Sequence, residues 1–217
     1  MFFESGNTRL YYERLGDGPA LLLLHGNGES CRIFDEAAAI LRERYTVYLI
    51  DTRGHGQSMP VESLHYQDMA EDLHLFITEL GIEKPAIYGF SDGGIIALLL
   101  ASQHPEVPGR IIASGVNANP KGIKPFWLTL FRLMHLFRPE ETMAMMLREP
   151  DITPADLARI TVPVTVLGGQ KDMIRRGHMQ QIAQAIPQGR YVELPGETHG
   201  SYVVHSQKIA RMILDGV

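Results

Sequence analysis

Short apolar runs alternate with helix-like segments along most of this chain, and that alternation restricts the fold more than any other feature. Five runs end in turn-forming residues, as strands buried on both faces of a parallel sheet do: 20–26, 45–51, 84–90, 109–116 and 162–169. Segments with helical spacing occupy 30–44, 66–80, 92–103, 175–186 and 202–214. Strands joined by helical crossovers predict an α/β fold, with an open and mostly parallel sheet flanked by helices.

Two segments depart from this rhythm. Residues 9–15 alternate between apolar and polar side chains, which predicts an antiparallel strand. Residues 117–160 are longer than one crossover helix requires, and they contain the helix-like stretches 125–137 and 141–149, rich in aromatic residues and methionine. Such side chains adapt well to ligands. We therefore expect a single domain over residues 1–217, with a short helical cap inserted at about 117–160.

Charge and cysteine content narrow the functional classes. The chain has 20 Lys and Arg against 25 Asp and Glu, a net charge of −5, so no basic surface is expected to attract nucleic acid or an anionic bilayer. Cys31 is the only cysteine, the start of the sequence lacks a signal-peptide pattern, and no apolar stretch approaches membrane-spanning length. We expect a cytoplasmic monomer or homodimer with no nucleic-acid or membrane partner.

The hexapeptide GFSDGG, residues 89–94, lies directly between a buried strand and an apolar helical segment. In a G-x-S-x-G turn of this kind the serine is held in a strained strand-to-helix bend, and its neighbours must be small. Ser91 would project above the sheet as a nucleophile, and the Asp92 N–H at the positive end of the helix would stabilise an oxyanion. A glycine-rich loop that only reverses the chain is the alternative.

A serine nucleophile needs a base, which a carboxylate commonly orients, and both should follow other strands of the sheet. Of nine histidines, His199 has this placement, in the loop after the short strand 190–194. Asp172 follows the strand 162–169 and falls between serine and histidine in the chain, the order usual for this architecture. A helix N-cap is its alternative role. Asn27, after the strand 20–26, is the expected second oxyanion donor through its backbone N–H, and we expect His25 to hold that loop.

Together these segments resemble the α/β-hydrolase superfamily, through HGNG (25–28), DTRGHGQS (51–58), GFSDGG (89–94), GGQKD (168–172) and PGETHG (195–200). The resemblance implies an α/β-hydrolase fold with an eight-stranded, mostly parallel sheet. It also implies a catalytic triad, two backbone oxyanion donors and a cap between residues 117 and 160. GFSDGG is similar to the nucleophile turn of the small serine hydrolases that include valacyclovirase-like enzymes.

The expected function is that of a serine hydrolase that cleaves a small ester or related acyl substrate through an acyl-enzyme. No metal-ligand spacing or phosphate loop is present, so no cofactor or metal is expected. An amino-acid ester or peptide hydrolase, or a ligand receptor with negligible turnover, remain alternatives, as does an amphipathic surface at 125–137 for a partner. Candidate pocket residues, which could instead be plain core, are Phe90, Asn117, Trp127, Phe131 and Met134.

Overall fold

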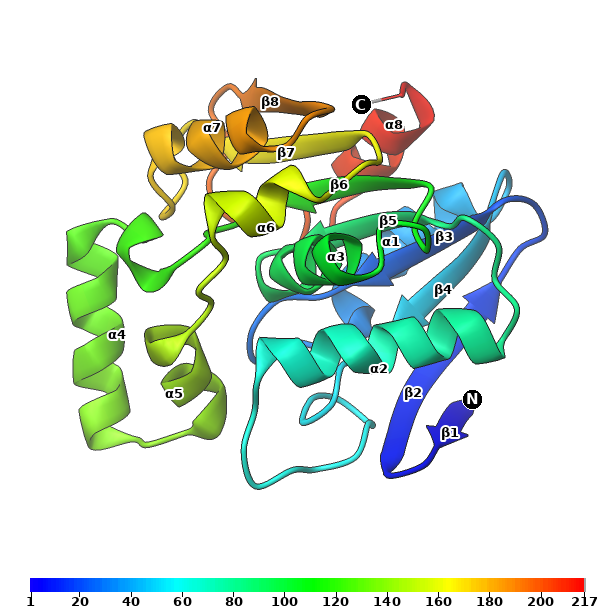
Figure 1. The fold of residues 1–217 in the computed structure, drawn as a ribbon, viewed down its shortest axis with the longest axis horizontal. Helices are drawn as coiled ribbons and strands as arrows, with labels where there is room; N and C mark the ends of the chain where they lie inside the picture. Colours follow the sequence, from blue (N-terminus) through cyan, green and yellow to red (C-terminus); the bar gives the residue numbers. More distant parts are fainter. Residues whose placement is uncertain (217) are drawn as a thin grey trace.

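The structure is a computed structural model that describes residues 1–216, and an eight-stranded sheet forms the centre of this part of the chain (Figure 1). Its strands are β1 (Phe2–Ser5), β2 (Thr8–Leu15), β3 (Ala20–Leu24), β4 (Thr46–Ile50), β5 (Ala86–Phe90), β6 (Arg110–Ser114), β7 (Val164–Gly169) and β8 (Gly189–Leu194). Their spatial order is β1-β2-β4-β3-β5-β6-β7-β8; β2 pairs antiparallel with both β1 and β4, and all other neighbouring strands pair parallel. The predicted α/β-hydrolase fold is confirmed, and β1 is a strand that the sequence patterns did not predict.

Helices cover both faces of the sheet, which explains why a central strand such as β3 is apolar without interruption (Figure 1). In β3, Leu22 and Leu24 pack on one face while Leu21 and Leu23 pack on the other, because successive side chains of a strand point to opposite sides. The first face is covered by α2 (Tyr66–Glu79), α3 (Asp92–Gln103), α6 (Pro154–Ala158) and α7 (Arg176–Ala185). The second face is covered by the short helix η1 (Cys31–Phe34), α1 (Asp35–Leu41) and α8 (Lys208–Leu214).

The long connection between β6 and β7 divides into two parts. After η2 (Pro120–Gly122), helices α4 (Pro125–Phe137) and α5 (Glu141–Arg148) pack against each other and project beyond the sheet (Figure 1). Helix α6 instead packs against α3 and α7, whereas the pair α4 and α5 contributes to the core a single buried residue, Met145. The helices that stand apart from the layered body are therefore α4 and α5, and we call this pair the cap.

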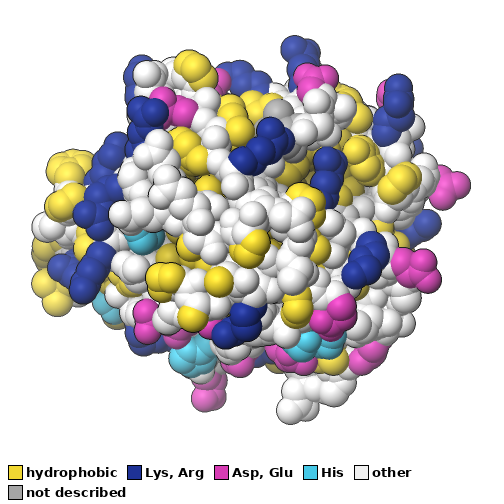
Figure 2. Space-filling model, turned by 45° about the horizontal axis from the view of Figure 1, so that its top comes forward, with side chains coloured by type: hydrophobic (Ala, Val, Ile, Leu, Met, Phe, Trp, Pro, Cys, Tyr) yellow, Lys and Arg dark blue, Asp and Glu magenta, His cyan; other side chains and the backbone are white. Residues whose placement is uncertain are grey.

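Helix α4 is the most solvent-exposed apolar element of the described chain. None of its residues is fully buried, and Phe126, Leu136 and Phe137 are 72%, 76% and 80% exposed. Hydrophobic side chains gather beside Lys and Arg at the cap end of the molecule in Figure 2. No helix within residues 1–216 has the length and apolar character needed to cross a bilayer.

Two helix predictions need correction. The segment 202–214 is helical only from Lys208, because His205 adopts a left-handed φ of 47° and its N–H donates to the carbonyl of Ile33 instead of continuing a helix. Tyr202 and Val203 lie in a turn, yet both are buried. Together with the apolar residues of α8 they produce a spacing in the sequence that resembles the buried face of one longer helix. The segment 30–44 forms η1 followed by the seven-residue α1.

Candidate active site

The turn between β5 and α3 holds Ser91 in a strained conformation. Its φ is 51° and its ψ is −113°, outside the regions that residues with a side chain usually adopt. The turn is tight enough that a Cβ at Gly89 would lie 2.3 Å from the carbonyl oxygen of Gly93. The Ser91 N–H donates to the carbonyl of Ser114 on β6 at 2.7 Å, which anchors the turn to the sheet. The serine is thus fixed at the carboxyl end of β5, as the GFSDGG pattern predicts.

Loops after two neighbouring strands bring His199 and Asp172 to this serine. His199 Nε2 lies 3.1 Å from Ser91 Oγ, and His199 Nδ1 lies 2.7 Å from Asp172 Oδ1. The Asp172 carboxylate is buried, and Oδ1 also accepts the N–H of Ile174 at 2.9 Å. With Nδ1–H donating to Asp172, Nε2 presents its lone pair to the serine hydroxyl. The structure therefore brings together the three side chains that the sequence singled out.

Two backbone N–H groups next to Ser91 have no hydrogen-bond partner within the described residues, those of Asn27 and Asp92. The loop after β3 is tied to the serine turn, because the N–H of Gly93 donates to the carbonyl of His25 at 3.0 Å. The Asn27 side chain donates to Asp92 Oδ2 and to the carbonyl of Thr142 in α5, each at 2.9 Å. Asn27 thus links the loop after β3, the serine turn and the cap.

The Asp92 side chain is a buried junction. Its Oδ1 accepts the hydroxyl of Tyr66, at the start of α2, at 2.8 Å, while Oδ2 accepts from Asn27. Burial raises the pKa of Asp92, and the hydrogen bonds from Asn27 and Tyr66 partly oppose that rise. Both carboxylate oxygens are therefore engaged in holding α2 and the β3 loop against the serine turn. Tyr66 had no predicted role, because a tyrosine that starts a helix carries no sequence signal for such a contact.

His25 holds the loop after β3 from inside the molecule. Its Nδ1–H donates to the carbonyl of Gly26 at 2.8 Å, and its Nε2 accepts the N–H of Thr52 at 3.1 Å. Burial is the main cause that lowers the pKa of His25 to about 4. The ring is consequently neutral near pH 7, which matches its arrangement of one donor and one acceptor.

A cavity of about 330 Å³ opens above Ser91, within the range typical of small-molecule sites. Of the five predicted pocket residues, Phe90, Asn117 and Phe131 line this cavity. Trp127 and Met134 do not line it, and they are 37% and 48% exposed. Helix α4 reaches the cavity only at Phe131, so residues one turn away on either side fall outside its rim. Side chains that sequence reasoning missed complete the apolar wall: Ile123, Met143, Met146, Met173, Ile174 and Val204.

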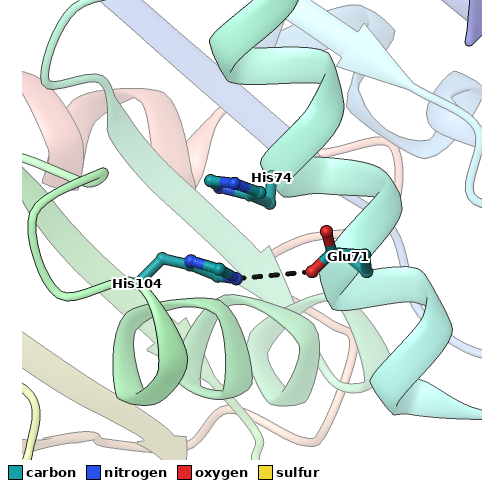
Figure 3. Close-up of side chains that lie close together, drawn as sticks. All are labelled: Glu71, His74 and His104. Carbon is teal, nitrogen blue, oxygen red and sulfur yellow. Dashed lines mark hydrogen bonds and ion pairs between the residues drawn. The ribbon is translucent and has the colours of Figure 1, made fainter.

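A second group of polar side chains lies between α2 and the end of α3, where Glu71, His74 and His104 meet (Figure 3). His104 Nε2 is 3.3 Å from a Glu71 carboxylate oxygen, and the two imidazole rings stack 3.7 Å apart with an interplanar angle of 6°. No metal-ligand spacing in the sequence indicated this group, since His104 is remote in the chain. Parallel rings direct their in-plane lone pairs side by side, whereas a zinc ion needs them to converge. In this arrangement the group joins α2 to α3.

Comparison with known proteins identifies the family. A model described as alpha/beta hydrolase fold matches residues 19–140, more than half of the chain. The chain belongs to this family. Within it, the chain is 35% identical over 141 residues to an uncharacterized protein of Mycobacterium bovis, a match that covers 64% of this chain and 40% of that protein. The chain therefore spans less than half the length of that curated relative.

Two further comparisons show a relative with a named activity and a solved structure of similar fold. The chain is 32% identical over 133 residues to the pimeloyl-[acyl-carrier protein] methyl ester esterase of Vibrio campbellii, covering 58% of this chain and 50% of the esterase. In structure it resembles the enol-lactonase from Burkholderia xenovorans, with a TM-score of 0.81, 19% identity and coverage of 99% and 98% of the two chains. At that identity the structural likeness supports the fold alone.

Proposed function

We propose that this alpha/beta hydrolase is a serine hydrolase that cleaves a small ester or a related acyl substrate. One observation carries the proposal: Ser91, His199 and Asp172 form a continuous hydrogen-bonded series, with distances of 3.1 and 2.7 Å, at the floor of a cavity. A histidine within hydrogen-bond reach of a serine, and itself oriented by a buried carboxylate, is the arrangement that activates a serine hydroxyl.

In the first half of the reaction, Ser91 Oγ bonds to the carbonyl carbon while its proton passes to His199 Nε2. The carbonyl oxygen becomes an oxyanion, which the unpartnered N–H groups of Asn27 and Asp92 would stabilise. Asp172 keeps the imidazole in the correct tautomer and stabilises its positive charge. When the bond to the alcohol oxygen breaks, His199 returns the proton to the departing alcohol, and the acyl group stays on Ser91.

Water completes the cycle. A water oxygen bonds to the acyl carbon as His199 Nε2 takes its proton, and the same two N–H groups hold the second oxyanion. Collapse of this intermediate breaks the bond to Ser91 Oγ, which recovers its proton from His199 and releases the acid. The relationship to a methyl ester esterase supports an ester as the substrate class. The cavity of about 330 Å³ supports a small substrate.

The test is the release of p-nitrophenol from acetate, butyrate and octanoate esters by the wild type and by Ser91→Ala. Labelling with a fluorophosphonate and peptide mapping would report whether Ser91 reacts. We expect turnover by the wild type, a label on Ser91, and loss of both in the variant, with the chain-length preference measuring the acyl pocket. A folded wild type that neither turns over any ester nor takes label on Ser91 would refute the proposal and favour a ligand receptor.

A further inference from the structure

Glu29 is a charged group in the cavity that the proposed reaction does not use. It follows the loop after β3, lines the cavity, and accepts the N–H of Gly26 through Oε2 at 3.0 Å. A Cβ placed on Gly26 would lie 2.8 Å from Glu29 Oε2 and 3.2 Å from Ser91 Cβ. The carboxylate and the serine side chain therefore flank the same glycine, which places Glu29 beside the reacting centre.

Glu29 also lacks the partners that a half-buried carboxylate usually has. Within residues 1–216 it forms no ion pair with Lys, Arg or His, and its Oε1 accepts no hydrogen bond. Asp92 differs, because both of its oxygens are occupied by Asn27 and Tyr66. Glu29 is consequently the carboxylate in this cavity with an oxygen available to a ligand.

The rest of the cavity wall suits a positive charge. Its ionisable lining residues are Glu29, Asp92 and His199, and no Lys or Arg of the described chain lines it. Phe131 and the methionines of α5 contribute an aromatic face and polarisable sulfur atoms. Aromatic faces attract cations, most strongly where water is excluded. Both the charge and the composition of the wall thus favour a cationic group over an anionic one.

The position of Glu29 has opposite consequences for neutral and cationic substrates. A carboxylate beside Ser91 repels the oxyanion that forms during attack on a neutral ester. Burial also raises the pKa of Glu29, because the charged form loses solvation, and the hydrogen bond from the Gly26 N–H only partly opposes that rise. A positive group on the substrate would offset both effects, since it neutralises the carboxylate while the oxyanion develops.

We propose that Glu29 binds a cationic group of the substrate, so that the site takes esters that carry an ammonium group in their acyl or alcohol part. This inference rests on the proposed serine hydrolase function and specifies its substrate class. Glu29 is then a specificity-determining residue. Its charge selects the substrate, and its hydrogen bond to Gly26 shapes the loop that carries Asn27.

Isosteric ester pairs separate the effect of charge from that of shape. For the acyl part, p-nitrophenyl 4-(trimethylammonio)butyrate is compared with p-nitrophenyl 5,5-dimethylhexanoate. For the alcohol part, acetylcholine is compared with 3,3-dimethylbutyl acetate. Each pair differs by a quaternary nitrogen in place of a carbon. The assays use wild type and Glu29→Gln at pH 8, above the ordinary range of a glutamate. Glutamine can still accept the Gly26 N–H but has no charge.

In at least one pair we expect the wild type to prefer the cationic ester by about 10-fold or more in kcat/KM, as a charge contact in a partly desolvated site allows. Glu29→Gln should lose that preference, so that the ratio of kcat/KM for the cationic ester to kcat/KM for the neutral ester falls to about one. Equal activity of the wild type on both members of each pair would overturn the inference. An equal fall for both members in Glu29→Gln would overturn it too, because that result indicates a purely structural role.

Labelling with a neutral fluorophosphonate keeps the two proposals distinguishable. A protein that takes label on Ser91 and turns over the neutral esters, yet shows no preference for a cation, refutes the role of Glu29 alone. A folded protein with neither label nor turnover refutes the serine hydrolase function, and the inference about Glu29 fails with it.

Discussion

Gly115 leaves space for the His199 ring, and we expect its replacement by alanine to lower the catalytic rate more than the stability of the fold. A Cβ at this position would lie 2.7 Å from His199 Cε1 and 2.9 Å from Nδ1, so the ring would have to move by several tenths of an ångström. Such a shift changes the 3.1 Å contact between His199 Nε2 and Ser91 Oγ. Because a misplacement of about 1 Å can cost roughly 100-fold in rate, we expect Gly115→Ala to lower kcat about 10- to 100-fold.

The chain contains a matched control for this substitution. Gly81 has the same φ of 63° as Gly115, but a Cβ there would meet no atom within 4 Å. Both alanine variants therefore incur the strain of a left-handed residue, about 1–2 kcal/mol, and a Tm lowered by a few degrees. Only Gly115→Ala adds the collision with the imidazole.

The assay is p-nitrophenyl butyrate hydrolysis under saturating substrate, together with thermal unfolding of both variants. We expect Gly81→Ala to keep wild-type kcat and Gly115→Ala to lose it. If Gly115→Ala retained wild-type kcat with the same Tm as Gly81→Ala, the ring would not depend on that glycine. A similar loss of kcat in both variants would show instead that backbone strain, and not the contact with His199, is responsible.

Three further predictions concern pH, orientation of the base and the cavity wall. The pKa of His25 is about 4 in the folded protein against 6.5 in the unfolded chain. The unfolded state therefore binds more protons between these values, and stability should fall by the order of 3 kcal/mol as pH drops through that window. His25→Gln should flatten this part of a urea-unfolding series against pH, whereas an unchanged slope would contradict it. Asp172→Asn should lower kcat roughly 10³- to 10⁴-fold with little change in KM; a loss below tenfold would argue against its role in orienting His199. Met146 lines the cavity, so Met146→Ala should change the preference for ester chain length. Trp127 does not line it, so Trp127→Ala should leave that preference unchanged.

Features that depend on local physical requirements were the most predictable from the sequence. Buried strands between helices need uninterrupted apolar runs, and a serine in a tight turn needs Gly89 and Gly93 around it, so strand positions and the placement of Ser91 are readable from one chain. The positions of Asp172 and His199 are also predictable, because both follow parallel strands, and side chains after parallel strands meet at one edge of the sheet. Strand β1 escaped prediction because its four residues, FFES, are too few for an alternation to register.

Prediction was weakest where helices meet the cavity or end within the core. Periodicity identifies α4 but not which of its residues faces a cavity, since that depends on how the helix packs against α5. Trp127 and Phe131 are one turn apart, yet only Phe131 lines the cavity. Glu29 was not singled out either, because a glutamate in a polar loop is ordinarily solvated. Its significance depends on its distance from lysine and arginine side chains, which no local pattern encodes.

Besides the buried Met145 of α5, polar contacts tie the cap to the body, and these contacts lead back to the Ser91 turn. Thr142 of α5 accepts the Asn27 amide, while Glu149, at the end of α5, accepts from the N–H of Tyr66 at 3.1 Å. The hydroxyl of Tyr66 donates to Asp92, and Asp92 accepts the same Asn27 amide. The contacts thus close a ring through the cap, α2, the serine turn and the loop after β3. We expect a displacement of α5 to act on the Asn27 loop through this ring, which would couple the position of the cap to the two N–H groups proposed as oxyanion donors.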